Sequence, residues 1–287
     1  MRLLFMGTPE FAAVSLRAIA DSAEHEIAGV FCQPDRPKGR GLKLIPPPVK
    51  SLALSLGLPV FQPSSLRDAD TERIARKLNP DVSVVVAYGR LLPQSLIDAP
   101  RLGTLNVHAS LLPRWRGAAP IQRAIMAGDR VTGVCVQQMR LELDSGDLIS
   151  SRSTPIAADE TYGELYDRLA ISGAELLTQT LRSPWNPTPQ VGEVTFAPPI
   201  MREDCTLDLT RPAAELACQV RALCPKPGAS VKLGGASFKI FKARVGGDGA
   251  LVLPCGANST LVVEELQAPG GKRMRSEDFL RGNQLNL

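Results

Sequence analysis

Residues 1–180 alternate between short β-rich runs and segments whose apolar residues recur with helical spacing. The β-rich runs lie at residues 3–6, 27–32, 82–87, 104–108 and 131–137. The helical segments lie at residues 11–19, 49–56, 71–78, 121–127 and 162–181. Strands that alternate with helices usually pair in parallel and are covered on both faces. We therefore predict an α/β domain built on a mostly parallel sheet.

The character of the sequence changes at a proline-rich stretch, Ser183-Pro184-Trp185-Asn186-Pro187-Thr188-Pro189. Because proline removes backbone donors and blocks helix continuation, we interpret residues 183–203 as a linker between domains at 1–182 and 204–287. One helical stretch at 212–223 then precedes short strands at residues 231–233, 238–243, 251–253 and 261–266. Glycine-rich turns separate these strands, which predicts a small, OB-like β-barrel as the C-terminal domain.

The composition is 44% hydrophobic and 22% charged, which is typical of a globular protein and excludes a disordered chain. No window is apolar for long enough to span a membrane, and the N-terminus has no signal-peptide pattern. We therefore expect a cytoplasmic protein with no membrane partner. The six cysteines include no C-x-x-C pair and the chain has only two histidines, so we expect no metal site and no disulfide framework.

Three polar residues lie where a parallel sheet presents reactive groups, beyond the ends of its strands. Asn106 and His108 are two positions apart on one predicted strand, so their side chains share a face. Asp144 follows the next strand, in a turn that contains glycine. An amide and an imidazolium can stabilise a developing oxyanion, and a carboxylate can orient the imidazole or accept a proton from an amine. This set suits acyl transfer without a protein nucleophile.

The same residues also have ordinary structural uses. A single histidine such as His108 is more often a hydrogen-bonded structural group than a catalytic one. Asn106 and Asp144 could bond to their own backbone within turns, which is the commoner use of both residue types. On the residues alone, both interpretations stay open.

A series of motifs in the first part of the chain resembles the methionyl-tRNA formyltransferase family in order and in spacing. The motifs are Gly7-Thr8-Pro9-Glu10-Phe11-Ala12, Gln33-Pro34-Asp35-Arg36-Pro37-Lys38-Gly39-Arg40-Gly41, Ala87-Tyr88-Gly89, Asn106-Val107-His108-Ala109-Ser110-Leu111-Leu112-Pro113, Arg116-Gly117-Ala118-Ala119-Pro120-Ile121-Gln122 and Leu143-Asp144-Ser145-Gly146-Asp147. Together they span essentially residues 1–180. The resemblance implies a Rossmann-like formyltransferase domain followed by a smaller β-barrel domain.

The resemblance also implies a reaction, in which 10-formyltetrahydrofolate donates a formyl group to the α-amine of methionyl initiator tRNA. In that reaction Asn106 and His108 would stabilise the oxyanion and His108 would protonate the leaving N10 nitrogen of the folate. Asp144 would help to deprotonate the amine. The folate-binding residues implied by the family are Tyr88, Gly89, Leu92, Ser110, Leu111, Leu112 and Pro113.

A basic loop lies between the second predicted strand and the helical segment at 49–56. It carries four cations interleaved with glycine and proline, namely Arg36, Lys38, Arg40 and Lys43. A loop this long in a compact α/β domain is usually functional, and its cations suit contacts with phosphates, although a solvated connection would look similar. The resemblance implies that the loop enters the acceptor arm of the tRNA, with Arg40 as its central arginine.

Two positions depart from the family pattern, which usually has an acidic residue at Arg140 and a glycine at Glu142. A first alternative is therefore a paralogue that formylates a small amine, such as an amino sugar or a natural-product intermediate. Such an enzyme has no evident need of the basic loop. A second alternative is a non-catalytic tRNA- or folate-binding protein, against which the intact Asn106, His108 and Asp144 argue. We expect a monomer.

Overall fold

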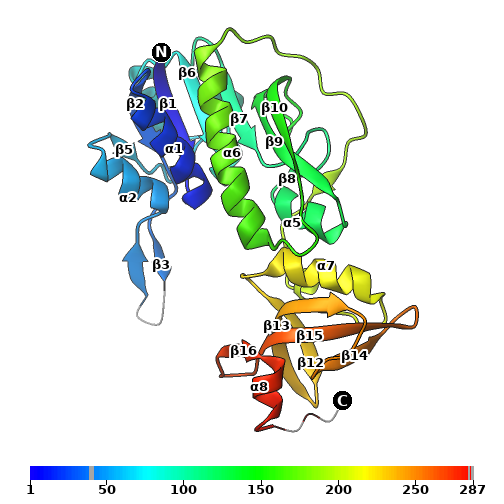
Figure 1. Ribbon diagram of the computed structural model, residues 1–287. Helices are drawn as coiled ribbons and strands as arrows, with labels where there is room; N and C mark the ends of the chain where they lie inside the picture. The colour runs from blue at the N-terminus through cyan, green and yellow to red at the C-terminus, as the bar shows by residue number, and fades with distance from the viewer. Residues whose placement is uncertain (39–41, 284, 286–287) are drawn as a thin grey trace. The chain divides into compact units, whose positions relative to one another are not determined.

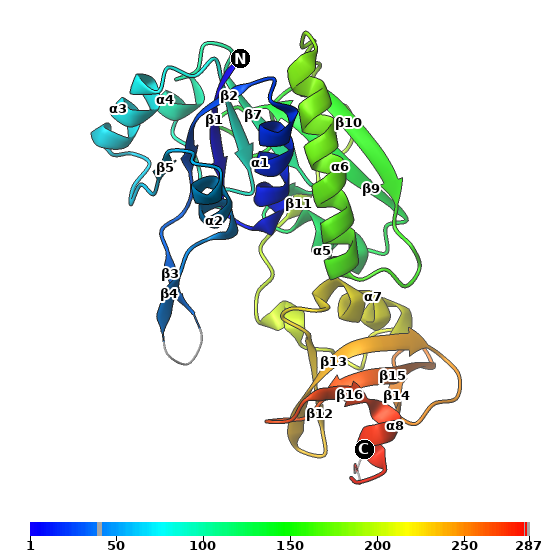
Figure 2. The same cartoon turned by 60° about the vertical axis from the view of Figure 1, so that its left-hand side comes forward.

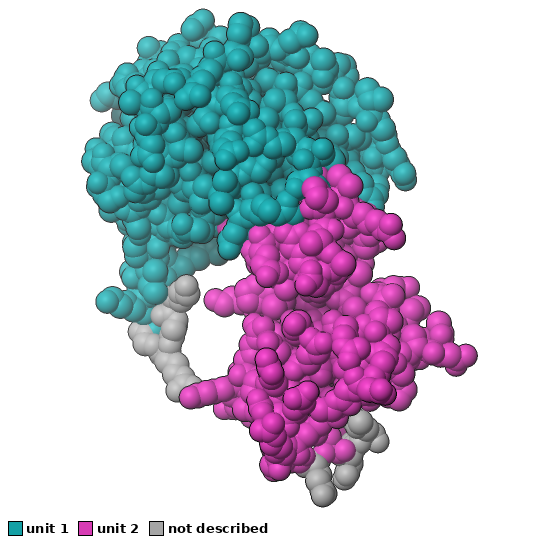
Figure 3. All heavy atoms as spheres, in the orientation of Figure 1, with its two compact units in different colours: residues 1–118, 133–154, 167–196 teal, residues 119–132, 155–166, 197–287 magenta. Residues whose placement is uncertain are grey.

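The computed structural model describes residues 1–38, 42–283 and 285. It contains two compact units, coloured separately in Figure 3. Unit 1 comprises Met1–Ala118, Gly133–Thr154 and Asp167–Phe196, and unit 2 comprises Ala119–Thr132, Pro155–Tyr166 and Ala197–Leu287. Each unit combines several separate stretches of the chain, because the units are defined by which residues lie close together. The predicted domain boundaries at residues 182 and 203 therefore stay a prediction.

A seven-stranded sheet runs through the α/β part in the order β10-β9-β7-β6-β1-β2-β5 (Figure 1). Its strands are β1 Arg2–Gly7, β2 Glu26–Phe31, β5 Val60–Phe61, β6 Val82–Val86, β7 Thr104–His108, β9 Val131–Gln138 and β10 Leu148–Pro155. Strands β5, β2, β1, β6 and β7 are mutually parallel, whereas β9 pairs antiparallel with β7. The predicted mostly parallel sheet is confirmed. Strand β5 was not predicted because it has two residues, and β10 because its sequence is largely polar.

Helices cover both faces of this sheet (Figures 1 and 2). They are α1 Glu10–Ser22, α2 Pro48–Ser55, α3 Ala69–Lys77, α4 Gln94–Ile97 and α6 Tyr162–Arg182, while α5 Pro120–Met126 belongs to unit 2. Strand β1 shows why both faces must be covered, since Leu4 and Met6 pack in one cluster with residues of α4, and the alternate residue Phe5 is also fully buried. A strand buried on both faces needs the nearly continuous apolar run that the sequence has here.

The C-terminal sheet is antiparallel and curled, which confirms the predicted barrel-like domain as a half-barrel. Its elements are η1 Glu203–Cys205, α7 Ala213–Leu223, β12 Ala229–Leu233, β13 Ala236–Val245, β14 Val252–Cys255, β15 Ser259–Gln267, β16 Arg273–Arg275 and α8 Ser276–Leu280. The strand order is β12-β13-β15-β14, and β16 also pairs with β15. Leu216 and Val220 of α7 join the core beneath the sheet. Gly234 and Gly235 connect β12 to β13 with φ of +54° and +81°, as a tight hairpin turn of this hand requires.

The proline-rich segment is ordered against unit 1 over much of its length. Thr188 forms a β-bridge with Leu148, and the short strand β11 (Phe196–Ala197) pairs with β8 (Arg116–Gly117). Part of the predicted linker is thus a structural element of the α/β part. Within the described ranges, no helix combines the length and the apolar character that crossing a membrane would require.

Candidate active site

Strand β7 delivers Asn106 and His108 to the end of the parallel sheet. Both side chains are buried, at 9% and 6% exposure, and strand alternation places them on one face as expected. Across the antiparallel pairing with β9, Asn106 lies opposite Gln137 and His108 lies opposite Cys135. Asn106 also lies opposite Val85 of β6, so it is held between two neighbouring strands.

Asp144 lies in the turn that connects β9 to β10 and has a positive φ of +49°. Left-handed backbone is unfavourable for a residue with a Cβ, so the surroundings must hold it there. Gly146 allows the turn to approach β9 closely, because an added Cβ would lie 1.8 Å from the carbonyl oxygen of Gln138. The glycine that the motif places two residues after Asp144 therefore has a steric purpose.

The structure brings Asn106, His108 and Asp144 together. The Asn106 Nδ2 atom donates to Asp144 Oδ1 at 3.3 Å, and His108 Nδ1 lies 3.5 Å from Asp144 Oδ2. The carboxylate also accepts from the Gly117 backbone N–H at 2.9 Å and from Gln137 Nε2 at 3.0 Å. With its side chain only 11% exposed, Asp144 is a nearly buried carboxylate fixed by several donors.

The imidazole of His108 is oriented from its other side by Trp115. Its Nε2 atom lies 2.8 Å from the Trp115 carbonyl oxygen, which can only accept, so Nε2 carries the proton in this hydrogen bond. Trp115 itself has a φ of +65°, and its N–H donates to Thr195 Oγ1. The contact of Nδ1 with Asp144 Oδ2 is longer, at 3.5 Å.

Three residues that were not predicted as site residues support this group. Gln137 is a polar residue at the end of the apolar strand β9, and this contrast was a usable signal. Arg116 belongs to one of the family motifs, but no role at the site was predicted for it. It is 9% exposed, and its Nη2 atom donates to Gln190 Oε1 at 2.7 Å. Gln190 lies in the proline-rich segment, where the sequence carries no signal for a role at the site.

The predicted folate-binding residues lie on two loops of unit 1. On the loop after β6, the side chains of Tyr88 and Leu92 pack into the hydrophobic core. Burial raises the pKa of Tyr88 to about 12, and its hydroxyl has no hydrogen-bond partner among the described residues. Leu91 of the same loop is 76% exposed, so it is the more accessible apolar side chain.

Gly89 and the second loop have defined conformations. Gly89 has a φ of +77°, and an added Cβ would come 2.5 Å from Gln33 Nε2, which donates to the Tyr88 carbonyl at 2.9 Å. On the other loop, Ser110 is buried and its hydroxyl donates to the Arg114 carbonyl at 2.6 Å. The rest of that segment is half-buried or buried, comprising Leu111, Leu112 and Pro113.

The predicted basic loop is a two-stranded ribbon in its described part. Strands β3 (Arg36–Lys38) and β4 (Lys43–Ile45) pair antiparallel, with Lys38 opposite Lys43. Arg40 lies outside the described residues. Lys43 is exposed, whereas the guanidinium of Arg36 donates to Gln33 Oε1. At the base of this basic hairpin, Lys50 Nζ binds both oxygens of Asp35 at 2.8 Å.

The two departures from the family pattern are accommodated by ion pairs. Arg140 Nη2 lies 2.7 Å from Asp147 Oδ2, and Glu142 Oε1 lies 3.9 Å from Arg116 Nη1. A polar cavity of about 390 Å³ adjoins this turn and is lined by Gln94 and Asp98 at the two ends of α4, by residues 138–141 and by Asp147. The charge reversal at Arg140 is therefore neutralised locally.

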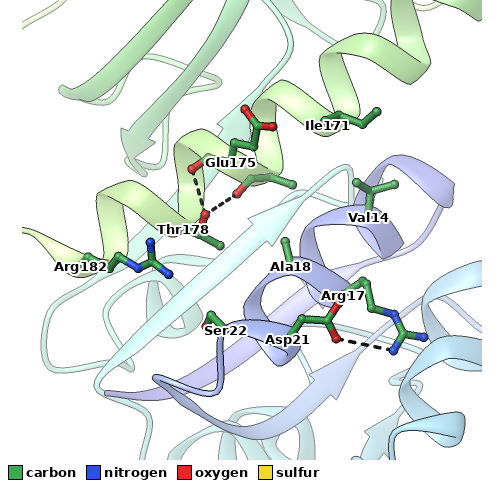
Figure 4. A pocket seen from close by; sticks show the side chains of 10 residues that line it. Val14, Arg17, Ala18, Asp21, Ser22, Ile171, Glu175, Thr178 and Arg182 are labelled. Atoms are coloured by element: carbon green, nitrogen blue, oxygen red, sulfur yellow. Dashed lines mark hydrogen bonds and ion pairs between the residues drawn. The ribbon is translucent and has the colours of Figure 1, made fainter.

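A second cavity of about 440 Å³ lies between α1 and α6 and contains none of these site residues (Figure 4). Its lining mixes apolar side chains such as Ile171 with the Arg17–Asp21 ion pair. In the described part of the chain, no group of three or more His, Cys, Asp or Glu residues is placed to hold a metal ion.

The chain matches two family models. The model described as formyl transferase covers residues 1–181, and the model described as the formyl transferase C-terminal domain covers residues 199–284. Fold and site thus define a formyl transferase.

Two relatives named methionyl-tRNA formyltransferase are similar over almost their whole length. The protein from Chromohalobacter salexigens is 47% identical over 98% of this chain and 93% of its own. The protein from Pseudomonas paraeruginosa is 48% identical over 97% of this chain and 95% of its own. The chain belongs to the methionyl-tRNA formyltransferase family.

Solved structures share the fold at lower identity. HypX from Aquifex aeolicus in complex with tetrahydrofolic acid matches with a TM-score of 0.65 and 20% identity over 98% of this chain and 47% of its own. An N-formyltransferase from Helicobacter canadensis, in complex with folinic acid and dTDP-3-aminofucose, matches with a TM-score of 0.67 and 15% identity over 91% of this chain and 98% of its own. At these identities the likeness concerns the fold alone.

Proposed function

We propose that this protein transfers a formyl group from 10-formyltetrahydrofolate to the α-amine of methionyl initiator tRNA, as the names of its full-length relatives indicate. The observation that carries the proposal is the convergence of Asn106, His108 and Asp144 in one buried group at the end of the sheet. A reduced folate supplies the formyl carbon. We propose further that the enzyme acts as a cytoplasmic monomer.

The arrangement of these side chains suits each proton movement of the transfer. Asp144 accepts the proton that the amine loses as its nitrogen bonds to the formyl carbon. Asn106 has a second amide hydrogen, beside the one given to Asp144, for the formyl oxygen as it gains negative charge. Protonated His108 stabilises the same oxygen and passes its proton to the leaving nitrogen. His108 Nδ1 faces Asp144 Oδ2 at 3.5 Å, so the proton can return from the carboxyl group to the imidazole afterwards.

The residues around the site fit a folate. Leu91, on the loop after β6, and Leu141, on the loop after β9, are exposed apolar side chains, at 76% and 65%. Leu141 lines the polar cavity beside the Asp144 turn. A flat aromatic ring system buries such side chains well, and backbone groups near Gly89 can recognise its polar edge. We propose that these loops, together with residues 110–113, hold the folate.

The basic hairpin supports tRNA as the acceptor. Exposed cations on a two-stranded ribbon can follow a phosphate backbone, and an amino sugar or other small amine has no need of them. We propose that Arg36, Lys38, Arg40 and Lys43 contact the acceptor arm, so that the methionine reaches Asp144.

The proposal is tested by incubating the protein with 10-formyltetrahydrofolate and methionine-charged initiator tRNA and detecting formyl-methionine by mass spectrometry after deacylation. We expect enzyme-dependent formylation, and a sharp loss with Arg40→Ala that spares slow hydrolysis of the formyl folate. Binding of the folate without formylation of the tRNA would instead favour the small-amine alternative. Equal tRNA activity after Arg40→Ala would contradict the role given to the hairpin.

A further inference from the structure

Gln190 is the one side chain of residues 188–193, within the predicted linker, that is turned toward the protein interior. Its neighbours Thr188, Pro189 and Val191 are exposed, as are Gly192 and Glu193, whereas Gln190 is half-buried. A connecting segment has no need to turn a single amide toward the protein interior. The contacts of that amide show what it does.

Both ends of the Gln190 amide are used. Its Nε2 atom donates to the carbonyl oxygens of Asp144 and Gly146, each at 2.8 Å. Its Oε1 atom accepts from Arg116, at 2.7 Å from Nη2 and 3.2 Å from Nε. The side chain therefore joins the backbone of the Asp144 turn to a buried guanidinium, through hydrogen bonds of which two are assisted by charge.

These contacts bear on a strained position. Asp144 has a φ of +49°, a left-handed conformation that residues with a side chain seldom adopt. Gln137 holds the same turn from the sheet side, through Asp144 Oδ1 and through the Gly146 N–H at 3.1 Å. Gln190 fixes the carbonyl groups of the turn while Gln137 fixes its carboxylate and amide. Gln190 Nε2 also lies 3.5 Å from Gln137 Oε1, so the two glutamines belong to one hydrogen-bond network around the turn.

We propose that Gln190 is a positioning residue for catalysis, which holds the Asp144 turn so that the carboxylate faces His108 and Asn106. The segment 183–203 then completes the active site as well as connecting the chain. This inference rests on the proposed function, because it assumes that Asp144 takes part in the transfer. Groups that orient a catalytic side chain commonly contribute roughly 10- to 100-fold to activity.

The test compares Gln190→Met, which keeps the volume but removes the hydrogen bonds, with Gln190→Ala and with the control Glu193→Ala in the same segment. We expect kcat for tRNA formylation to fall roughly 10- to 100-fold in both Gln190 variants, with KM for tRNA and for 10-formyltetrahydrofolate within about twofold of wild type. Glu193→Ala should match wild type, because that side chain is exposed.

Further measurements separate positioning from folding and from the proposed function. Thermal unfolding of Gln190→Met shows whether the variant is folded at the assay temperature, and a folded variant with lowered kcat supports positioning. A kcat within twofold of wild type in both Gln190 variants, or a loss that appears in KM alone, overturns the inference. Wild-type protein that fails to formylate the tRNA overturns the proposed function instead. Hydrolysis of 10-formyltetrahydrofolate then still reports whether the Gln190 variants impair Asp144.

Discussion

The carboxylate oxygens of Asp144 accept hydrogen bonds from a backbone N–H, from Gln137 and from Asn106. Each of these three donors needs an oxygen of residue 144 as its acceptor. In Asp144→Asn the new amide would turn its NH₂ group toward at least one donor, and the base would be lost. We expect kcat to fall on the order of 10²–10⁴-fold with folate binding retained.

Folate binding can be measured by equilibrium fluorescence, and turnover by the tRNA assay. The exposed Asp159→Asn serves as the matched control and should leave both unchanged. Turnover of Asp144→Asn within threefold of wild type would refute the proposed role of the carboxylate.

Gly89 is constrained both by its backbone and by a neighbour. Its φ is +77° and an added Cβ would lie 2.5 Å from Gln33 Nε2, the atom that holds the Tyr88 carbonyl. Gly89→Ala should therefore lower the free energy of unfolding by about 1–2 kcal/mol and weaken folate binding as well.

Gly57 offers a control with the same backbone but open space, since its φ is +68° and nothing lies within 4 Å of an added Cβ. Gly57→Ala should cost stability through its backbone alone and leave folate affinity unchanged. Urea unfolding and folate titration of both variants check this. Equal folate affinity for the two variants would show that Gln33 does not support the loop.

At the scale of the elements, Arg123 of α5 anchors the turn η1 within unit 2. Its Nη1 and Nη2 donate to the two oxygens of Asp204, at 2.9 Å and 2.8 Å, and this hydrogen bonding lowers the pKa of Asp204 below its ordinary value. The folded state binds the Asp204 proton more weakly than the unfolded state does. The ion pair of Asp204 with Arg123 therefore stabilises the folded state fully at pH values above the unfolded pKa of Asp204. It is lost as the pH falls through the folded pKa.

Asp204→Asn should therefore lower the free energy of unfolding by about 2 kcal/mol at pH 7, and the difference from wild type should shrink below about pH 4. Urea unfolding at both pH values measures this. The exposed pair of Arg281 with Asp278 is the control, and Asp278→Asn should cost less than about 1 kcal/mol at either pH. A difference that stays constant down to pH 3 would exclude the ionised pair as its origin.

For the molecule as a whole, the net charge of +4 is mildly basic, and its effect on tRNA binding depends on where the cations lie. Each cation that contacts a phosphate releases counterions, so affinity for tRNA should fall with salt. Lys43→Ala should reduce the slope of log Kd against log salt by about 1, whereas the control Lys77→Ala, exposed on α3, should leave it unchanged.

Filter binding of methionyl initiator tRNA across a range of KCl concentrations measures both slopes. The same slope for wild type and Lys43→Ala would show that the described part of the basic hairpin does not reach the phosphates.

The sequence predicted the local features of the fold well. Periodicity is a local property, so the strand at 104–108 and the helix at 162–181 could be recognised from apolar spacing alone. Elements without such a pattern were missed, such as the largely polar strand β10, because their pairing is decided by a neighbour in the sheet.

The candidate site divides in the same way. Asn106 and His108 share a strand, so alternation alone predicts that they share a face. Asp144 reaches Asn106 across 38 residues, and that meeting depends on the antiparallel return of β9 and on the left-handed turn that follows it. Motif order indicated that the three residues act together but not which atoms meet.

The sequence by itself determined the class of fold and the residue types available for formyl transfer. Both follow from local properties, namely the spacing of apolar residues and the order of the motifs along the chain. Only the tertiary structure decided that Gln137, Arg116 and Gln190 restrain the Asp144 turn. The physical reason is that hydrogen bonds between distant segments depend on where backbone carbonyls and side-chain amides come to lie after packing. No local pattern in a proline-rich segment encodes that position.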